Sequence, residues 1–237
     1  MAPYEVARER AFGSPEAASE RVSTFLRSVY AWMAAGLTIT AVTAAFVAAT
    51  PSIAMAIVQN RLLFWAIVIA QLGIVFVLSA RVQTLASSTA SALFIAYSAL
   101  TGVTFSFILL VYTGQSIATT FVVTAGMFGA LAMYGTFTTR SLAGWGQFLF
   151  MGLIGVVLAS IVGIFWQSSA LQFVITFAGV IVFTGLTAYD ANRLRAMALS
   201  MPSGQTGSYA IVGALTLYLD FINLFLMLLR FLGDRRR

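Results

Sequence analysis

The sequence predicts an all-α integral membrane protein with seven transmembrane helices, and three observations support that fold class. Of the 237 residues, 60% are hydrophobic and only 8% are charged, whereas soluble domains are close to half apolar and a quarter charged. The apolar residues gather in seven long blocks, each near the ~20 residues that a helix needs to cross a bilayer. Short polar breaks separate these blocks, and no soluble domain fits between them.

Each block ends at residues that typically bound a membrane span. We expect spans at about 28–49, 62–80, 89–112, 116–138, 144–166, 170–191 and 209–232, which together form one transmembrane domain over residues 28–233. The bounding residues are helix breakers, arginines or small polar residues: Pro51 after the first span, Arg81 after the second, Thr113, Gly114 and Gln115 after the third, Arg140 after the fourth, and Gln167, Ser168 and Ser169 after the fifth. A loop over residues 193–208 follows the sixth span, and a basic tail over 234–237 follows the seventh.

The N-terminal segment, residues 1–27, is expected to lie in the cytoplasm. Ser14, Pro15 and Glu16 have the order of a helix start, with a capping residue, a proline at the first position and an acid in the first turn. They predict a short surface helix that leads into the first span. The segment has no short apolar core with a cleavage site, so we expect no signal peptide and a first span that stays in the mature protein.

Missing residue types exclude several chemistries. The chain has no Cys and no His, which excludes disulfides, thiolate nucleophiles and Cys-ligated metals, and removes the usual sensor of neutral pH. All 13 basic residues are Arg, so a retinal Schiff base is impossible. The net charge of +6 and the pI near 10.2 do not indicate nucleic-acid binding, because the arginines lie mostly at span ends, where they set topology.

The arginines also predict orientation. With the N-terminus in the cytoplasm, that side collects Arg8, Arg10, Arg21, Arg27, Arg81, Arg140, Arg193 and Arg195. Seven spans place Arg230 and the tail arginines on the far side, against the positive-inside rule. Either the earlier loops dominate the orientation, or the last segment dips into the membrane and returns. We favour seven spans.

Two of the seven acidic residues, Asp190 and Asp220, fall within or at the edge of spans. An ionised carboxylate at the bilayer centre costs at least ~2.5–3.5 kcal/mol, so Asp220 should have a partner, face water or carry a proton. Asp190 has a simpler alternative, a local ion pair with Arg193 at i+3. Arg81, on the same side of the membrane, is a second candidate partner for Asp190, or merely an anchor of topology.

If the two acids meet, they form a proton switch. Two carboxylates within hydrogen-bonding distance cannot both ionise cheaply, so they share a proton and titrate as a unit. Protonated, the pair would hold the sixth and seventh helices together; deprotonated, it would repel and present two anionic oxygens. These would attract a hard cation such as Ca²⁺, but two carboxylates fall short of the six to eight oxygens of a closed calcium site. Weak, transient coordination suits passage of the ion.

Several sequence blocks resemble one known family. GLTAYDANRLRAM (185–197) and LYLDFINLFLMLLRFLG (217–233) are similar to the Bax inhibitor-1 family, also called the transmembrane Bax inhibitor motif family, in its bacterial YccA-like branch. FLRSVYAWMAAGLTITA (25–41), FILLVYTGQSIATTFVVTAGMFGALAMYG (107–135) and GWGQFLFMGLIG (144–155) add to this, and the resemblance covers nearly all of the chain after residue 22.

The resemblance implies a fold, a function and a site. It implies seven helices with the last at the centre, and a pH-sensitive calcium leak through a pair formed by Asp190 and Asp220. It also implies a gating salt bridge from Arg81, and Asn223 and Arg193 are candidate supporting residues. Two positions depart from the family pattern: Phe107 stands where a proline of the third helix is common, and Gln71 replaces an acid found in the second helix of a bacterial relative.

Three functions follow as hypotheses. The first is a cation leak channel, with calcium as the transported ion, gated by Asp190 and Asp220. The second is a non-conducting regulator that binds another membrane protein, such as a membrane-bound AAA protease, through the tail and the 193–208 loop. The third is an intramembrane aspartyl protease; LYLD at 217–220 lacks the GxGD-type sequence that such enzymes need, so we expect no enzyme and no cofactor. The sequence leaves the oligomeric state open.

Overall fold

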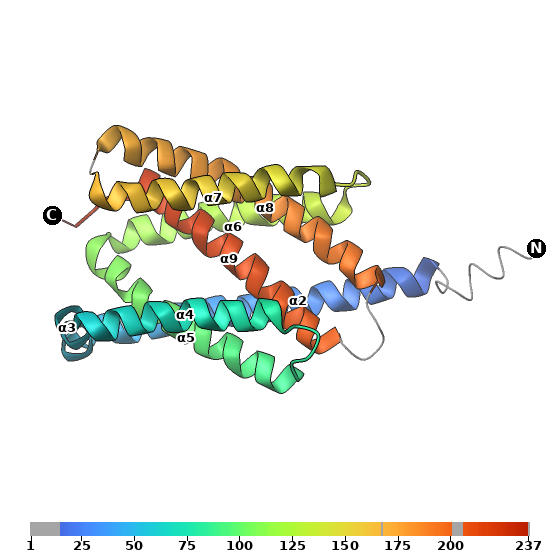
Figure 1. The fold of residues 1–237 in the computed structure, drawn as a ribbon, viewed down its shortest axis with the longest axis horizontal. Coiled ribbons are helices and arrows are strands. Elements are labelled where there is room, and N and C mark those ends of the chain that lie inside the picture. The colour runs from blue at the N-terminus through green and yellow to red at the C-terminus, as the bar shows by residue number, and fades with distance from the viewer. Residues whose placement is uncertain (1–14, 167, 201–205, 237) are drawn as a thin grey trace, which may run out of the picture.

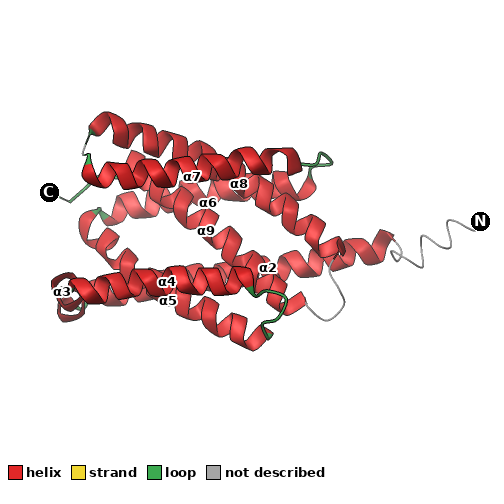
Figure 2. Cartoon of the chain, viewed as in Figure 1, coloured by secondary structure: helices red, strands yellow, loops and turns green. Residues whose placement is uncertain are grey.

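A computed structural model describes residues 15–166, 168–200 and 206–236. Its elements are α2 (Pro15–Ala48), α3 (Pro51–Gln59), α4 (Arg61–Ala80), α5 (Ser87–Val111), α6 (Gly114–Phe137), α7 (Ala143–Phe165), α8 (Ser169–Ser200) and α9 (Thr206–Leu232). In the part of the chain described, seven of these helices are long and apolar enough to cross a membrane, and none of the elements is a strand (Figure 2). The predicted all-α, seven-span fold class is confirmed.

Two helices are longer than the apolar blocks that predicted them. The expected surface helix and first span are one continuous helix, α2. The sixth span was expected to end near residue 191, but α8 continues to Ser200, so residues 193–200 are helical where a loop was predicted. The extra turns hold Ala, Leu, Arg and Met, which all favour helix. Residues 201–205, with Pro202 and Gly204, lie outside the described residues. Pro51 begins the short helix α3, a common position for proline.

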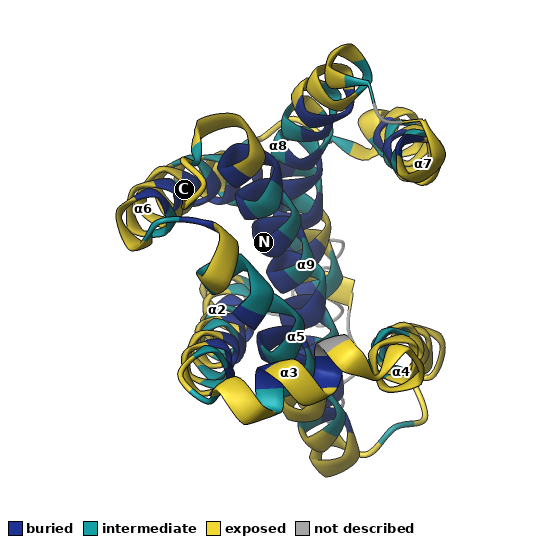
Figure 3. Ribbon diagram, turned by 90° about the vertical axis from the view of Figure 1, so that its left-hand side faces the viewer, coloured by how far each residue is buried: buried dark blue, intermediate teal, exposed yellow. Residues whose placement is uncertain are grey.

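The last helix, α9, is the core of the bundle. In its most apolar stretch 72% of the residues are buried, against at most 33% in any other span. It contacts α2, α4, α5, α6 and α8, whereas α7 packs mainly on α8 and α4 mainly on α5. Figure 3, which looks along the bundle, shows α9 as the most completely buried helix. Small residues such as Ala210, Gly213 and Ala214 permit this close packing on several sides.

The two ends of the bundle carry different connections (Figure 1). The start of α2, the α4–α5 and α6–α7 connections, the end of α8 and the start of α9 lie at one end, here called the N-terminal end. The α5–α6 turn, the end of α7, the start of α8 and the last described residues lie at the other, the C-terminal end. If all seven spans cross a membrane, residues 15 and 236 lie on opposite sides of it.

The C-terminal tail is fixed to the α5–α6 turn. Thr113 donates its backbone N–H to the carbonyl oxygen of Asp234 over 3.1 Å, and Arg236 donates its backbone N–H to that of Val111 over 2.8 Å. Tyr112 and Arg235 form an isolated antiparallel bridge between these two bonds. The tail therefore has a defined path along the C-terminal end of the bundle.

Candidate functional site

The structure brings Asp190 and Asp220 together at the contact between α8 and α9. Both side chains are buried, with 7% and 5% of their surface exposed. Their carboxyl groups lie within hydrogen-bonding reach of each other. The Oδ2 atom of Asp220 is buried and has no hydrogen-bond partner among the described residues. We call these two residues the aspartate pair.

The longer α8 explains how the two acids reach a similar depth. Asp220 is fourteen residues after the start of α9 at Thr206, which is ~21 Å along the helix. Asp190 is ten residues before the end of α8 at Ser200, or ~15 Å. Measured from these helix ends, the two depths differ by only ~6 Å, which helix tilt accommodates.

The remaining predicted residues lie around the pair at different distances. Arg193 is exposed on α8, and its positive charge acts on Asp190. Arg81 caps the end of α4 and is exposed; within the described ranges no hydrogen bond or ion pair joins it to either aspartate. Asn223 donates its side-chain N–H to the carbonyl oxygen of Leu219 over 2.8 Å. The predicted gating salt bridge is thus not formed in this conformation.

The two departures from the family pattern occupy ordinary helical positions. α5 runs unbroken from Ser87 to Val111. It passes through Phe107, which stands where the family pattern commonly has a proline. Gln71 is half-buried on α4, and its side-chain N–H approaches the hydroxyl oxygen of Thr104 at 3.5 Å. Within the described residues no group of three or more His, Cys, Asp or Glu side chains could hold a metal. The aspartate pair is therefore limited to two carboxylates for a cation.

Sequence reasoning missed the polar contacts that hold α8 against the α6–α7 connection. Asn192 donates its side-chain N–H to the carbonyl oxygen of Gly135 at 3.0 Å and accepts the backbone N–H of Leu142 at 3.4 Å. Arg195 donates to the carbonyl oxygen of Thr138 at 2.9 Å. Asn192 follows Asp190 by two residues, about 200° around the helix, so the two side chains leave α8 on nearly opposite sides. One segment of α8 therefore contacts α9 through Asp190 and the α6–α7 connection through Asn192.

Asn192→Ala is expected to lower the free energy of unfolding by about 1–3 kcal/mol, because it leaves the carbonyl of Gly135 and the N–H of Leu142 without their partner. Thermal unfolding in detergent micelles measures this loss. Gln147→Ala is the matched control, since Gln147 is exposed on α7 and should change stability by less than about 0.5 kcal/mol. Equal effects of the two substitutions would contradict the anchoring role.

A second missed group lies on α9, two residues before Asp220. The hydroxyl groups of Tyr218 and Thr40 are 2.6 Å apart, and Thr40 also donates to the carbonyl oxygen of Ser98 at 2.9 Å. The Tyr218 ring is fully buried and meets the rings of Phe94 and Tyr97 edge to face. These contacts join α2, α5 and α9, and they fix the face of α9 that lies roughly opposite Asp220.

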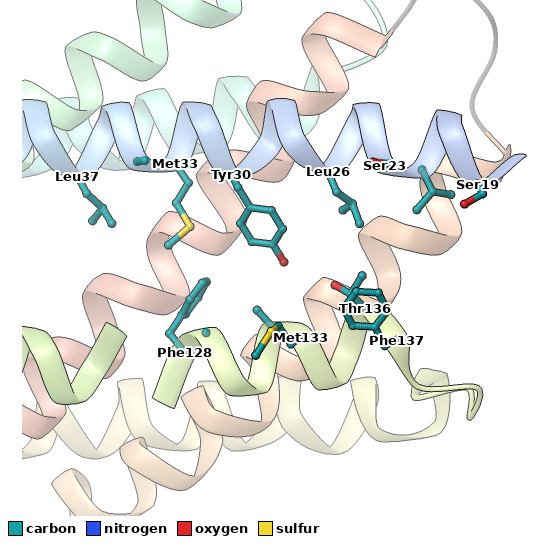
Figure 4. A pocket seen from close by; sticks show the side chains of 14 residues that line it. Ser19, Ser23, Leu26, Tyr30, Met33, Leu37, Phe128, Met133, Thr136 and Phe137 are labelled. Carbon is teal, nitrogen blue, oxygen red and sulfur yellow. The ribbon is translucent and has the colours of Figure 1, made fainter. Parts of the chain in front are cut away.

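The described part of the bundle has cavities toward both of its ends. The first, about 590 Å³, lies between α2 and α6 near the N-terminal end. Figure 4 shows it flanked by Tyr30 and Met33 from α2 and by Phe128, Met133 and Thr136 from α6. Its lining is mostly apolar, so a lipid tail suits it better than a hydrated ion.

The second cavity, about 1040 Å³, lies among α7, α8 and α9 at the C-terminal end, and we call it the α7–α9 cavity. Its lining mixes apolar residues with polar ones, including Ser160, Gln172 and Asn223. Asn223 follows Asp220 by one helical turn, ~4.5 Å along α9. Polar space thus extends from the C-terminal end to within about one turn of the aspartate pair.

In the described part of the chain, six apolar spans surround a central seventh that carries a buried carboxylate, and together they define an integral membrane protein with an ionisable core. Residues 22–237 match the family described as "Inhibitor of apoptosis-promoting Bax1". The chain therefore belongs to the Bax inhibitor-1 family, as its sequence motifs predicted.

Curated bacterial relatives share nearly the whole chain. The chain is 51% identical to the "Inner membrane protein YbhL" of Escherichia coli strain K12, over 91% of this chain and 93% of that one. It is 46% identical to an uncharacterized protein of Borreliella burgdorferi, over 90% and 92% of the two chains. A protein of Deinococcus radiodurans, also uncharacterized, is 44% identical over 92% and 93%.

Proposed function

We propose that this protein is a pH-sensitive cation leak channel, with calcium as the transported ion, in which the aspartate pair controls the contact between α8 and α9. The observation that carries the proposal is the burial of two carboxyl groups against each other, on consecutive helices, in a membrane-spanning bundle. A structural role alone gives no reason for two costly acids at one contact.

The sign of the pH dependence follows from the charge on the pair. When the pair holds a proton, a hydrogen bond joins α8 to α9. When that proton leaves, two carboxylates face each other in a poorly hydrated site, and repulsion favours their separation. Flux should therefore be low at acidic pH and rise with pH. Arg193 moderates the repulsion through its charge near Asp190, and the exposed Arg81 is the proposed partner of Asp190 after separation.

The α7–α9 cavity supplies one half of the proposed path, because it ends beside Asn223. Two carboxylates and water hold Ca²⁺ more weakly than a closed site of six to eight oxygens, so the ion binds transiently and leaves. From the distribution of arginines we also propose that the N-terminal end faces the cytoplasm; the inner-membrane location of the Escherichia coli relative supports a bacterial inner membrane.

The test is calcium flux into vesicles that contain the purified protein and a calcium dye, measured across pH. Asp190→Asn and Asp220→Asn each keep a hydrogen-bonding side chain but remove the repulsion, so both variants should lose most of the rise in flux with pH. Asp234→Asn is the matched control, because Asp234 is exposed in the tail and its described contacts use the backbone. The control should behave like the unmodified protein.

Unchanged flux and pH dependence in both pair variants would refute the gating role. Absence of flux in pure vesicles, together with a stable cross-linked membrane partner such as an AAA protease, would favour the regulator instead. Residues 234–236 are hydrogen-bonded to the α5–α6 turn. The tail therefore has fewer backbone groups available to bind such a partner than an unattached tail would have.

A further inference from the structure

We propose that the α7–α9 cavity binds the headgroup of an anionic phospholipid from the leaflet at the C-terminal end, with Arg230 and Arg235 contacting its phosphate. This inference does not rest on cation conduction. The cavity lies among the end of α7, the start of α8 and the end of α9. All three of these helix ends lie at the C-terminal end of the bundle (Figure 1), the level at which lipid headgroups meet the protein.

Charge in the cavity favours an anion. Arg230 and Arg235 line it, and none of the described lining residues is acidic. A guanidinium group has five N–H donors and no acceptor. In the described part of the chain, neither of these two guanidinium groups has a hydrogen bond or ion pair within the protein. Two unpaired cations with donors suited to phosphate oxygens therefore face one cavity.

The tail positions Arg235 before any ligand binds. The backbone bonds of Asp234 and Arg236 to the α5–α6 turn hold the residues on either side of it. The backbone N–H of Asp234 also donates to the hydroxyl oxygen of Ser116 at 2.9 Å. Because the chain is ordered on both sides of Arg235, binding an anion there costs less conformational entropy than recruiting a free tail.

The rest of the lining suits a lipid better than a free anion. Val157, Ile161 and Phe173 present exposed apolar side chains at the cavity, where acyl chains can pack. Gln172 and Ser160 add polar groups near the headgroup level. A volume of about 1040 Å³ also greatly exceeds the space that one phosphate ion fills. The positive charges of Arg230 and Arg235 disfavour a cation at the opening of the α7–α9 cavity. A bound lipid phosphate would neutralise these charges.

The proposal is tested by titrating the detergent-purified protein with phosphatidylglycerol, phosphatidylcholine or inorganic phosphate, and measuring bound lipid by native mass spectrometry and the melting temperature by thermal unfolding. Phosphatidylglycerol should bind more tightly than phosphatidylcholine and raise the melting temperature more. Each arginine near lipid headgroups should contribute about fivefold to affinity, so R230Q/R235Q should lose roughly 25-fold for phosphatidylglycerol and little for phosphatidylcholine.

Two control variants separate this site from general attraction to anionic lipid. Arg61→Gln removes an exposed arginine at the same end of the bundle but outside the cavity, and should change affinity by less than about twofold. R230K/R235K keeps both charges and should retain most of the preference, which excludes misfolding as the cause of the loss. Equal binding of the two lipids, an equal loss in Arg61→Gln, a preference that survives in R230Q/R235Q, or equally tight binding of inorganic phosphate would each overturn the proposal.

Discussion

Gly135→Ala is expected to separate α6 from α8 and to cost about 3 kcal/mol of stability, the upper end of the range for overpacking. A Cβ atom at Gly135 would overlap the backbone carbonyl of Ala188, two residues before Asp190. Backbone yields less readily than a side chain, so the helices must move apart. That movement also strains the bond from Asn192 to the carbonyl of Gly135. The melting temperature in detergent should fall by about 6–12 °C.

Gly126→Ala on the same helix is the matched control. A Cβ atom at Gly126 meets no other heavy atom within 4 Å, and alanine favours helix over glycine by about 0.5–1 kcal/mol. This variant should therefore unfold at the same or a slightly higher temperature. A melting temperature of Gly135→Ala that matches that of Gly126→Ala would show that α6 and α8 do not depend on this close approach.

Tyr218→Ala is expected to have a comparable or larger effect, about 3–5 kcal/mol, because it empties the space of a fully buried ring in the central helix. Tyr218→Phe removes only the hydroxyl contact with Thr40. Hydrogen bonds between membrane helices contribute on average ~0.6 kcal/mol and at most ~1.7 kcal/mol. Packing of the Tyr218 ring against Phe94 and Tyr97 should therefore dominate, and Tyr218→Phe should retain most of the stability.

Thermal unfolding of the two Tyr218 variants beside Tyr134→Ala checks this ranking. Tyr134 is 53% exposed on α6, so its removal should change stability by less than about 0.5 kcal/mol. If Tyr218→Phe lost as much stability as Tyr218→Ala, the hydroxyl group rather than the ring would hold α9 in place, and the ranking of packing above hydrogen bonding would be wrong.

Composition was sufficient to predict the fold class, but not the full length of the helices. Apolar blocks mark the part of a helix that lies in lipid, and they stop where Arg193 and Arg195 begin. The helix itself continues to Ser200 because its residues still favour helix in water. The same reasoning divided α2 into a surface helix and a span, although its backbone is continuous.

The candidate acids were predictable because a carboxylate in an apolar stretch is costly wherever it points. Their partners were not. Asn192 binds Gly135 from 57 residues away, and Tyr218 contacts Thr40 across 178 residues. The chain has three Asn and eight Tyr residues, and only the three-dimensional arrangement distinguishes these two from the rest. The one available sign was that both lie two residues from an aspartate, in motifs that already drew attention.

The central position of α9 has a consequence for biogenesis. The ribosome makes this helix after the other six spans, so those six enter the membrane before the helix that most of them pack against exists. Until α9 is inserted, α2, α5 and α8 lack their main shared neighbour, and Asp190 has no carboxyl partner. Assembly of the bundle therefore depends on the last insertion step, and a ribosome that stops before α9 releases helices without a core.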